Sequence, residues 1–150
     1  MRYQDTGNVH MDFHLATNTT IHYVLEVYGE TFLKELWRRT AQQVYKDIYE
    51  HLKQGDMRPL LEHWEYYFTR EKGVFHLTKD SKGAVLVVDE CPAVRHLREK
   101  GVTPEPCFCS QTRHMNEAWS EGTPFAITTE TTGEGSCRQA IRRREAAAKL

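Results

Sequence analysis

The chain has no long hydrophobic run and almost no net charge. Its 150 residues carry 20 Lys and Arg against 21 Asp and Glu, which gives a formal net charge of −1. No apolar stretch approaches the length needed to cross a bilayer, and the mixed charges give no reason to expect nucleic acid as a partner. No secretory signal peptide opens the sequence. We therefore expect a soluble, cytoplasmic protein with neither a membrane nor a nucleic acid as partner.

The sequence also has few cysteines, and they are not spaced as typical zinc knuckles. The four are Cys91, Cys107, Cys109 and Cys137, and the only close pair is Cys107-x-Cys109. Structural zinc usually draws on paired C-x₂₋₄-C knuckles. A disulfide framework is not expected either, because a chain of this length with 39% hydrophobic residues can build its own core. We expect no cofactor, with a zinc–thiolate site on the four cysteines, and His96 or His114 in reserve, as the alternative.

The length fits one domain. Residues 1–17 are polar and without hydrophobic period, so we expect a flexible N-terminal arm there. Residues 18–141 form the predicted domain, and residues 142–150 read as a basic tail whose final part is also interpretable as a cloning remnant.

The first half of the domain predicts helices. A helix over 21–28 follows a plausible cap at 18–20, and after Gly29 apolar residues recur every three or four positions from Phe32 to Leu52. Gly55 closes this second helix, and Pro59 opens a shorter one with Leu60, Leu61, Trp64 and Phe68 on one side.

The second half predicts two β-hairpins with two short helices between them. The segments 74–78 and 84–88 flank a turn, and so do 125–131 and 136–141. Because helices and hairpins come in separate runs, without βαβ alternation, we predict an α+β domain. Its N-terminal helices should pack on an antiparallel sheet built from the two hairpins.

Both short helices are predicted to begin at a cysteine. Cys91 stands at an N-cap with Pro92 at the first helical position and Gly101 after the end, and Cys109 opens the next helix. Free N–H groups and the helix dipole favour a thiolate at such a position. The sequence thus predicts two thiols of lowered pKa, although free cysteine also serves often as a small buried hydrophobe.

The order of these motifs resembles a known family. Cys91-Pro92, a helix ending at Gly101, Pro106-Cys107-Phe108-Cys109, Phe125 and Gly133-x-Gly135-x-Cys137 resemble the family named for L-2-amino-thiazoline-4-carboxylic acid hydrolase. The resemblance covers roughly residues 84 to 141. It implies a cysteine-dependent hydrolase that opens a small cyclic amidine or a related C–N or C–S substrate. The family commonly has an aspartate three residues after the Phe-Cys cysteine, where this chain has Thr112.

Opening such a ring needs a nucleophile and a proton donor. Cys109 is the first candidate nucleophile and Cys91 the second, with Cys137 orienting the substrate. For proton transfer we expect His96, His114 or Glu117, although a solvated helix charge is the favoured interpretation of Glu117.

The substrate carboxylate needs a clamp, for which an arginine suits best. We assign Arg113, Asn116 and Thr112 to substrate binding, with Arg95 and Arg138 also within reach by position. The remaining histidines lack ligand spacing and receive no functional assignment. They are His10, His14, His22, His51, His63 and His76.

Two other functions stay open. One is a non-catalytic module that binds a small ligand or a metal through the thiols. The other is a structural or partner-binding protein, with the cysteines in the core and a face around Trp37 and Trp64 used for dimerisation; a homo-oligomer fits either.

Overall fold

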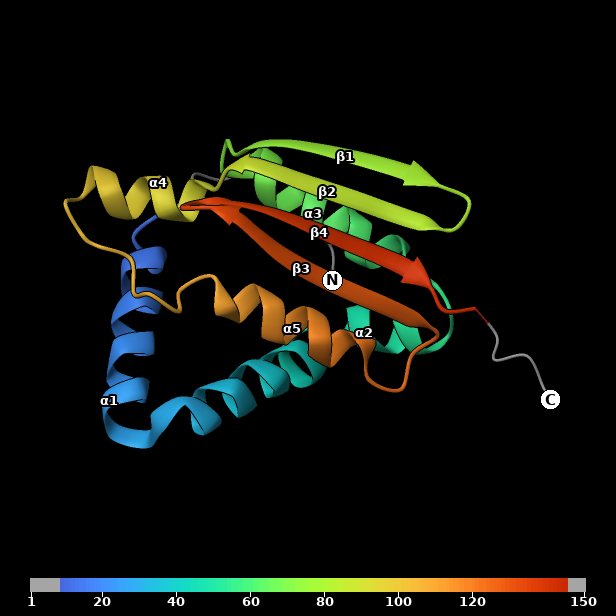
Figure 1. Ribbon diagram of the computed structural model, residues 1–150, viewed down its shortest axis with the longest axis horizontal. Helices are drawn as coiled ribbons and strands as arrows, with labels where there is room; N and C mark the ends of the chain where they lie inside the picture. The colour runs from blue at the N-terminus through green and yellow to red at the C-terminus, as the bar shows by residue number, and fades with distance from the viewer. Residues whose placement is uncertain (1–8, 146–150) are drawn as a thin grey trace.

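The computed structural model describes residues 9–145, and Figure 1 shows their helices on an antiparallel sheet. The elements in chain order are α1 (Phe13–Arg39), the π-helix η1 (Thr40–Val44), α2 (Lys46–Lys53), α3 (Arg58–Arg70), β1 (Val74–Asp80), β2 (Gly83–Glu90), α4 (Pro92–Glu99), α5 (Ser110–Ser120), β3 (Phe125–Gly133) and β4 (Ser136–Arg143). The predicted α+β class, with two hairpins and two helices between them, is confirmed.

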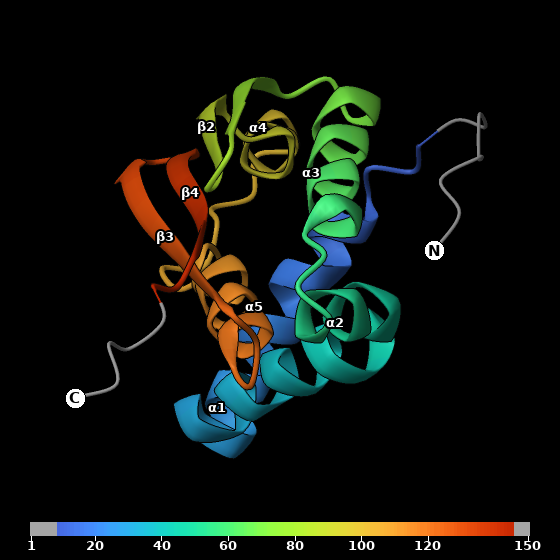
Figure 2. The same ribbon diagram turned by 90° about the vertical axis from the view of Figure 1, so that its right-hand side faces the viewer.

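The second strands of the two hairpins pair in the middle of the sheet, in the order β1-β2-β4-β3. Val88 of β2 lies opposite Cys137 of β4, and Cys137 lies opposite Thr131 of β3. Figure 2 shows the helices on one side of the sheet. Since side chains alternate between the two faces of a strand, Cys137 and Gln139 of β4 share a face, as the sequence predicts. Pairing of β2 with β4 therefore brings Cys137 close to the end of β2, where Cys91 follows.

Helix α1 begins earlier than the sequence suggests. It starts at Phe13, so residues 13–17 are helical and not part of an arm, while residues 1–8 lie outside the described chain. The predicted break at Gly29 is confirmed as a kink, where the backbone has φ 80° and ψ 174°. Among residues 9–145, no helix is both long and apolar enough to cross a membrane.

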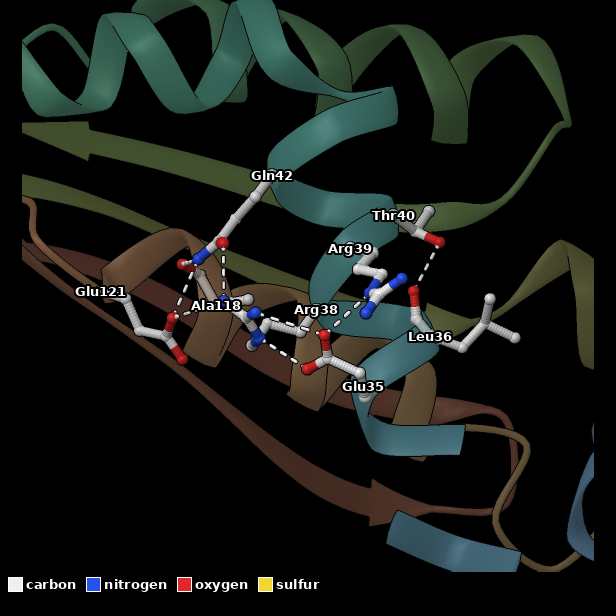
Figure 3. Close-up of polar contacts among 8 residues, drawn as sticks. All are labelled: Glu35, Leu36, Arg38, Arg39, Thr40, Gln42, Ala118 and Glu121. Atoms are coloured by element: carbon white, nitrogen blue, oxygen red, sulfur yellow. Dashed lines mark hydrogen bonds and ion pairs between the residues drawn. The ribbon is translucent and has the colours of Figure 1, made fainter. Parts of the chain in front are cut away.

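The predicted single helix from Phe32 to Leu52 is wrong in its middle. The π-helix η1 interrupts it, and the helical path breaks at the next residue, Tyr45, where φ is −92° and ψ 38°. Figure 3 shows how Gln42 ties this segment to the end of α5: its Nε2 donates to Ala118 O at 3.0 Å and lies 2.9 Å from Glu121 Oε2. Arg38 holds the other side of Gln42, with Nη1 2.9 Å from Oε1. Such wider turns occur often at functional sites.

Two hydrophobic clusters make up the core. The first lies between the sheet and η1, α2, α3 and α5 and contains Trp64; the second joins α1, α4 and Phe108 and contains Trp37. Both tryptophans are buried, Trp37 9% and Trp64 4% exposed, so the predicted dimerisation face around them is wrong. Cys91 packs against both clusters.

The predicted basic tail contributes to the fold as far as the structure describes it. Arg142 Nη1 lies 2.6 Å from Asp80 Oδ2, Arg143 Nη2 donates to Gly55 O at 2.8 Å, and Arg144 Nε donates to Phe125 O at 2.9 Å. Arg142 and Arg143 belong to β4. These arginines connect the end of the chain's last strand to three other segments, and of the predicted tail only residues 146–150 lie outside the described chain.

Candidate functional site

A cavity of about 210 Å³ lies between the sheet and the helices, and three of the four cysteines line it. Cys91 reaches it from the junction of β2 and α4, Cys109 from the start of α5, and Cys137 from β4. Pockets for drug-sized ligands run from about 300 to 1,000 Å³. The volume therefore favours a small ligand.

Local geometry explains the position of Cys91. It is the extended N-cap residue of α4, followed by Pro92 at the first turn, and its N–H donates to Gly135 O at 2.7 Å. Gly135 has φ +80°, and a Cβ there would lie 3.1 Å from Val94 Cγ1. Glycine thus allows the β3–β4 turn to lie close against α4 and to hold the Cys91 backbone.

The pKa values of the cysteines shift in the direction opposite to that predicted from the helix starts. Burial raises the pKa of Cys91 more than the N–H groups of Val94 and Ala93 lower it. Burial also raises the pKa of Cys109, with a further rise from Cys91 and a decrease from Arg113, and it raises that of Cys137 to about 11. Desolvation disfavours the charged thiolate more than the helix dipole favours it. All three are neutral thiols at pH 7.

Beside Cys91 lies a buried pair that no sequence motif predicts. His14 Nε2 is 2.8 Å from Glu71 Oε2, and both side chains are almost fully buried. Burial keeps the pKa of the Tyr67 hydroxyl well above its usual range, and the negative charge of Glu71 raises it further. Glu71 contributes to the raised pKa of Cys91 and therefore lies near that thiol. No spacing rule relates residues 14 and 71, so the sequence carries no signal for this pair.

Arg95 positions Glu71 relative to Cys91. From α4 its Nη1 donates to Lys72 O at 3.0 Å and its Nη2 to Glu71 O at 3.1 Å. It also forms an ion pair with Glu90. Arg95 is thus occupied in joining the end of α3 to α4, and the expectation that it could clamp a substrate carboxylate is not supported.

One wall of the cavity is aromatic. Tyr45, His63 and Trp119 stand edge to face, with ring centroids 5.1 Å apart for Tyr45–His63 and 5.9 Å for Tyr45–Trp119. Burial lowers the pKa of His63 to about 4, so this ring is neutral at pH 7. His63 and Tyr67 are four residues apart on α3, beside its apolar stripe. In a helix, a spacing of four residues indicates that two side chains lie on the same face, so the sequence held a signal for this pair.

The two histidines expected to transfer protons do not line the cavity. His96 Nε2 lies 3.0 Å from Asp12 Oδ1, and His114 Nδ1 lies 3.1 Å from Glu117 Oε2 in an exposed pair on α5. The solvated interpretation of Glu117 is supported. His14 and His63 occupy the places expected for His96 and His114, because the fold brings α1 and α3 over the thiols.

The predicted substrate-binding residues do not all line the same cavity. Thr112 and Asn116 line the cavity, and Asn116 Nδ2 lies 2.8 Å from Gln139 Oε1 and 2.7 Å from Thr129 Oγ1. Arg113 instead lines a wider cleft of about 790 Å³, together with Cys107 and His114. The cleft and the cavity share Phe108, Cys109, Thr131 and Gly135 among their lining residues, so they meet at Cys109.

The four cysteines do not assemble as a metal site. Within residues 9–145, no group of three or more His, Cys, Asp or Glu side chains is arranged to hold a metal ion. Cys107 lines the cleft and not the cavity, so it does not join Cys91, Cys109 and Cys137 there.

Comparisons of the chain with protein-family models, curated proteins and solved structures return no match.

Proposed function

We propose that the protein is a cysteine-dependent hydrolase that opens a small cyclic amidine or a related C–N or C–S substrate, such as a thiazoline carboxylate. The observation that carries this proposal is the placement of Cys91, Cys109 and Cys137 in one small cavity beside the buried His14–Glu71 pair. A thiol and an adjacent acid–base group are the two parts that covalent hydrolysis requires.

Cys91 is the favoured nucleophile, ahead of Cys109. It is the thiol whose pKa responds to Glu71, and it interacts electrostatically with both other cavity thiols. Because its pKa is raised, it needs a base, and the His14–Glu71 pair is the nearest candidate. Cys109 stays second, since Arg113 opposes the rise of its pKa.

The reaction follows from these roles. The Cys91 thiol gives its proton to the His14–Glu71 pair, and the thiolate bonds to the amidine carbon while the C=N π electrons move to nitrogen, which takes up a proton. The tetrahedral adduct then breaks a ring C–N or C–S bond, and the leaving atom takes a proton. Water adds to the same carbon, the bond to Cys91 breaks, and the thiol is regenerated. One water is consumed for each ring opened.

Arg113 is the proposed clamp for a substrate carboxylate. It lines the cleft next to Cys109, and its positive charge opposes the rise of the Cys109 pKa. Its guanidinium fork matches a carboxylate. A ring in the cavity could thus extend its carboxylate past Cys109 into the cleft.

The motif resemblance supports the same reaction class. The motif residues that line the cavity are Cys91, Phe108, Cys109, Gly135 and Cys137. Thr112, where the family commonly has an aspartate, lines the cavity too. An aspartate at this position would place its carboxylate at the cavity, and this chain lacks that carboxylate. Glu71 is the buried carboxylate that could take its place.

The test is ring opening of 2-amino-thiazoline-4-carboxylate, followed by mass spectrometry. We expect Cys91→Ser to lower turnover at least about a hundredfold. Cys107→Ser is the matched control and should stay within about twofold, because Cys107 does not line the cavity in which the ring is opened. Turnover that survives in Cys91→Ser but is lost in Cys109→Ser would reverse the assignment; survival in both would refute covalent catalysis.

A second candidate is a non-catalytic module for a small ligand, and the raised pKa values of all three cavity thiols favour it. Neutral thiols bind a ligand without attacking it. Under this alternative the same thiazoline binds but is recovered unchanged after prolonged incubation. Metal analysis of the dialysed protein tests the zinc form of the alternative, for which stoichiometric zinc is required.

A further inference from the structure

Asn116, which lines the cavity, has an unused hydrogen-bond acceptor. The residue is 1% exposed and lies among the lining residues. Its Oδ1 has no hydrogen-bond partner in the described chain. Buried polar atoms are nearly always paired, and leaving one unpaired costs free energy.

The neighbours of Asn116 hold its amide group in this orientation. Both acceptors near Nδ2, Gln139 Oε1 and Thr129 Oγ1, are within 2.8 Å. The other end of the Gln139 amide is also engaged, because Nε2 lies 3.8 Å from Cys137 Sγ. The amide protons of Asn116 are therefore satisfied by protein, and its carbonyl oxygen is left for a group that enters the cavity.

We infer that Asn116 Oδ1 accepts a hydrogen bond from an N–H of the substrate, so that the substrate is an amidine- or urea-like group with at least one N–H at the reacting end. This deepens the proposed function and rests on it. The rings of Tyr45, His63 and Trp119 in the same cavity suit a small flat molecule. A site built around a hydrogen bond rejects an analogue that lacks the donor, because the buried acceptor is then left unpaired.

The experiment uses two neutral five-membered rings that differ in the donor. Imidazolidin-2-one has a ring carbonyl flanked by two N–H groups, and cyclopentanone has the same ring size and carbonyl without N–H. Each is titrated into the Cys91→Ser protein and followed by NMR, which makes the measurement independent of turnover. We expect imidazolidin-2-one to bind at least about tenfold more tightly and to shift the side-chain amide signals of Asn116.

Asn116→Leu should abolish the preference, and Cys107→Ser, at a residue that does not line the cavity, should keep it. If Asn116→Leu does not fold, the inference is tested by the Asn116 side-chain amide signals of the Cys91→Ser protein, which should shift when imidazolidin-2-one binds. Equal binding of the two rings, binding of neither, or unshifted Asn116 signals overturns the inference. A preference for imidazolidin-2-one in a protein that never turns over a thiazoline supports this inference and refutes only the hydrolase.

Discussion

His14 and Glu71 are 57 residues apart in the sequence, yet His14 Nε2 lies 2.8 Å from Glu71 Oε2 in a buried pair. A carboxylate removed from water needs a partner, and His14 supplies one from the first turn of α1. The pair joins the start of α1 to the end of α3 beside Cys91. Assembly of the candidate site therefore depends on the first helical turn of the chain as well as on the cysteine motifs.

Glu71→Gln should lower the free energy of unfolding by about 1–3 kcal/mol, since it removes the charge from a buried hydrogen-bonded pair. Glu117→Gln is the control: Glu117 also pairs with a histidine, but it is half exposed, 49% at the side chain, and its loss should cost within about 0.5 kcal/mol. Urea unfolding at pH 7 compares the two. Equal losses of unfolding free energy in the two variants would show that burial of the His14–Glu71 pair does not increase its contribution to stability.

Native alkylation should find Cys91, Cys109 and Cys137 all slow to react at pH 7, because burial raises each pKa. The labelling rate of Cys137 should rise with a midpoint near pH 11, its pKa being about 11. Glu71→Gln should move the Cys91 profile to lower pH, because the carboxylate there opposes thiolate formation. Site-resolved peptide mass spectrometry across pH measures each profile. Rapid labelling of any of the three below about pH 8.5 contradicts the prediction.

His63 should make the fold sensitive to mild acid. Burial lowers its pKa from 6.5 to about 4, so between these values the unfolded chain binds a proton that the folded chain does not. The contribution of neutral His63 to the free energy of unfolding is therefore fully present above pH 6.5, and it is lost as the pH falls towards 4. His63→Gln should flatten this part of the stability curve, whereas His76→Gln, at an exposed position of β1, should not. Denaturant midpoints from about pH 4 to 8 test the difference; parallel curves for wild type and His63→Gln would refute it.

Gly135→Ala should destabilise the protein and disturb Cys91. The substitution combines a positive φ with a Cβ only 3.1 Å from Val94 Cγ1, and Gly135 O accepts the Cys91 N–H. We expect a loss of about 2 kcal/mol or more, and a changed alkylation rate at Cys91. Gly101→Ala is the matched control, because φ there is +70° but nothing lies within 4 Å of the place that the added methyl group would take. It should cost about 1 kcal/mol and leave Cys91 unchanged. Identical effects of the two substitutions would remove the argument for close packing at Gly135.

The elements that the sequence predicts well are those set by neighbouring residues. Gly29 and Gly55 interrupt or end helices, Pro92 and Gly101 bound α4, and alternating residues make two hairpins, because caps, turns and periodicity act over a few positions. The π-helix at Thr40–Val44 escapes such rules. Its wider turn is held by Gln42 and Trp119, whose bonds run between η1 and the distant α5.

For the candidate site, the sequence by itself determined which residues begin α4 and α5, and so placed Cys91 and Cys109 at helix starts. Only the tertiary structure decided what surrounds them. Packing of α1 against α4 and α5, and of α3 against the sheet, brings His14 and His63 to the cavity of the thiols in place of His96 and His114, and it removes the thiols from water. The helix dipole is a local property that can be read from sequence; desolvation depends on every segment that covers a group, and here it determines the direction of the pKa shift.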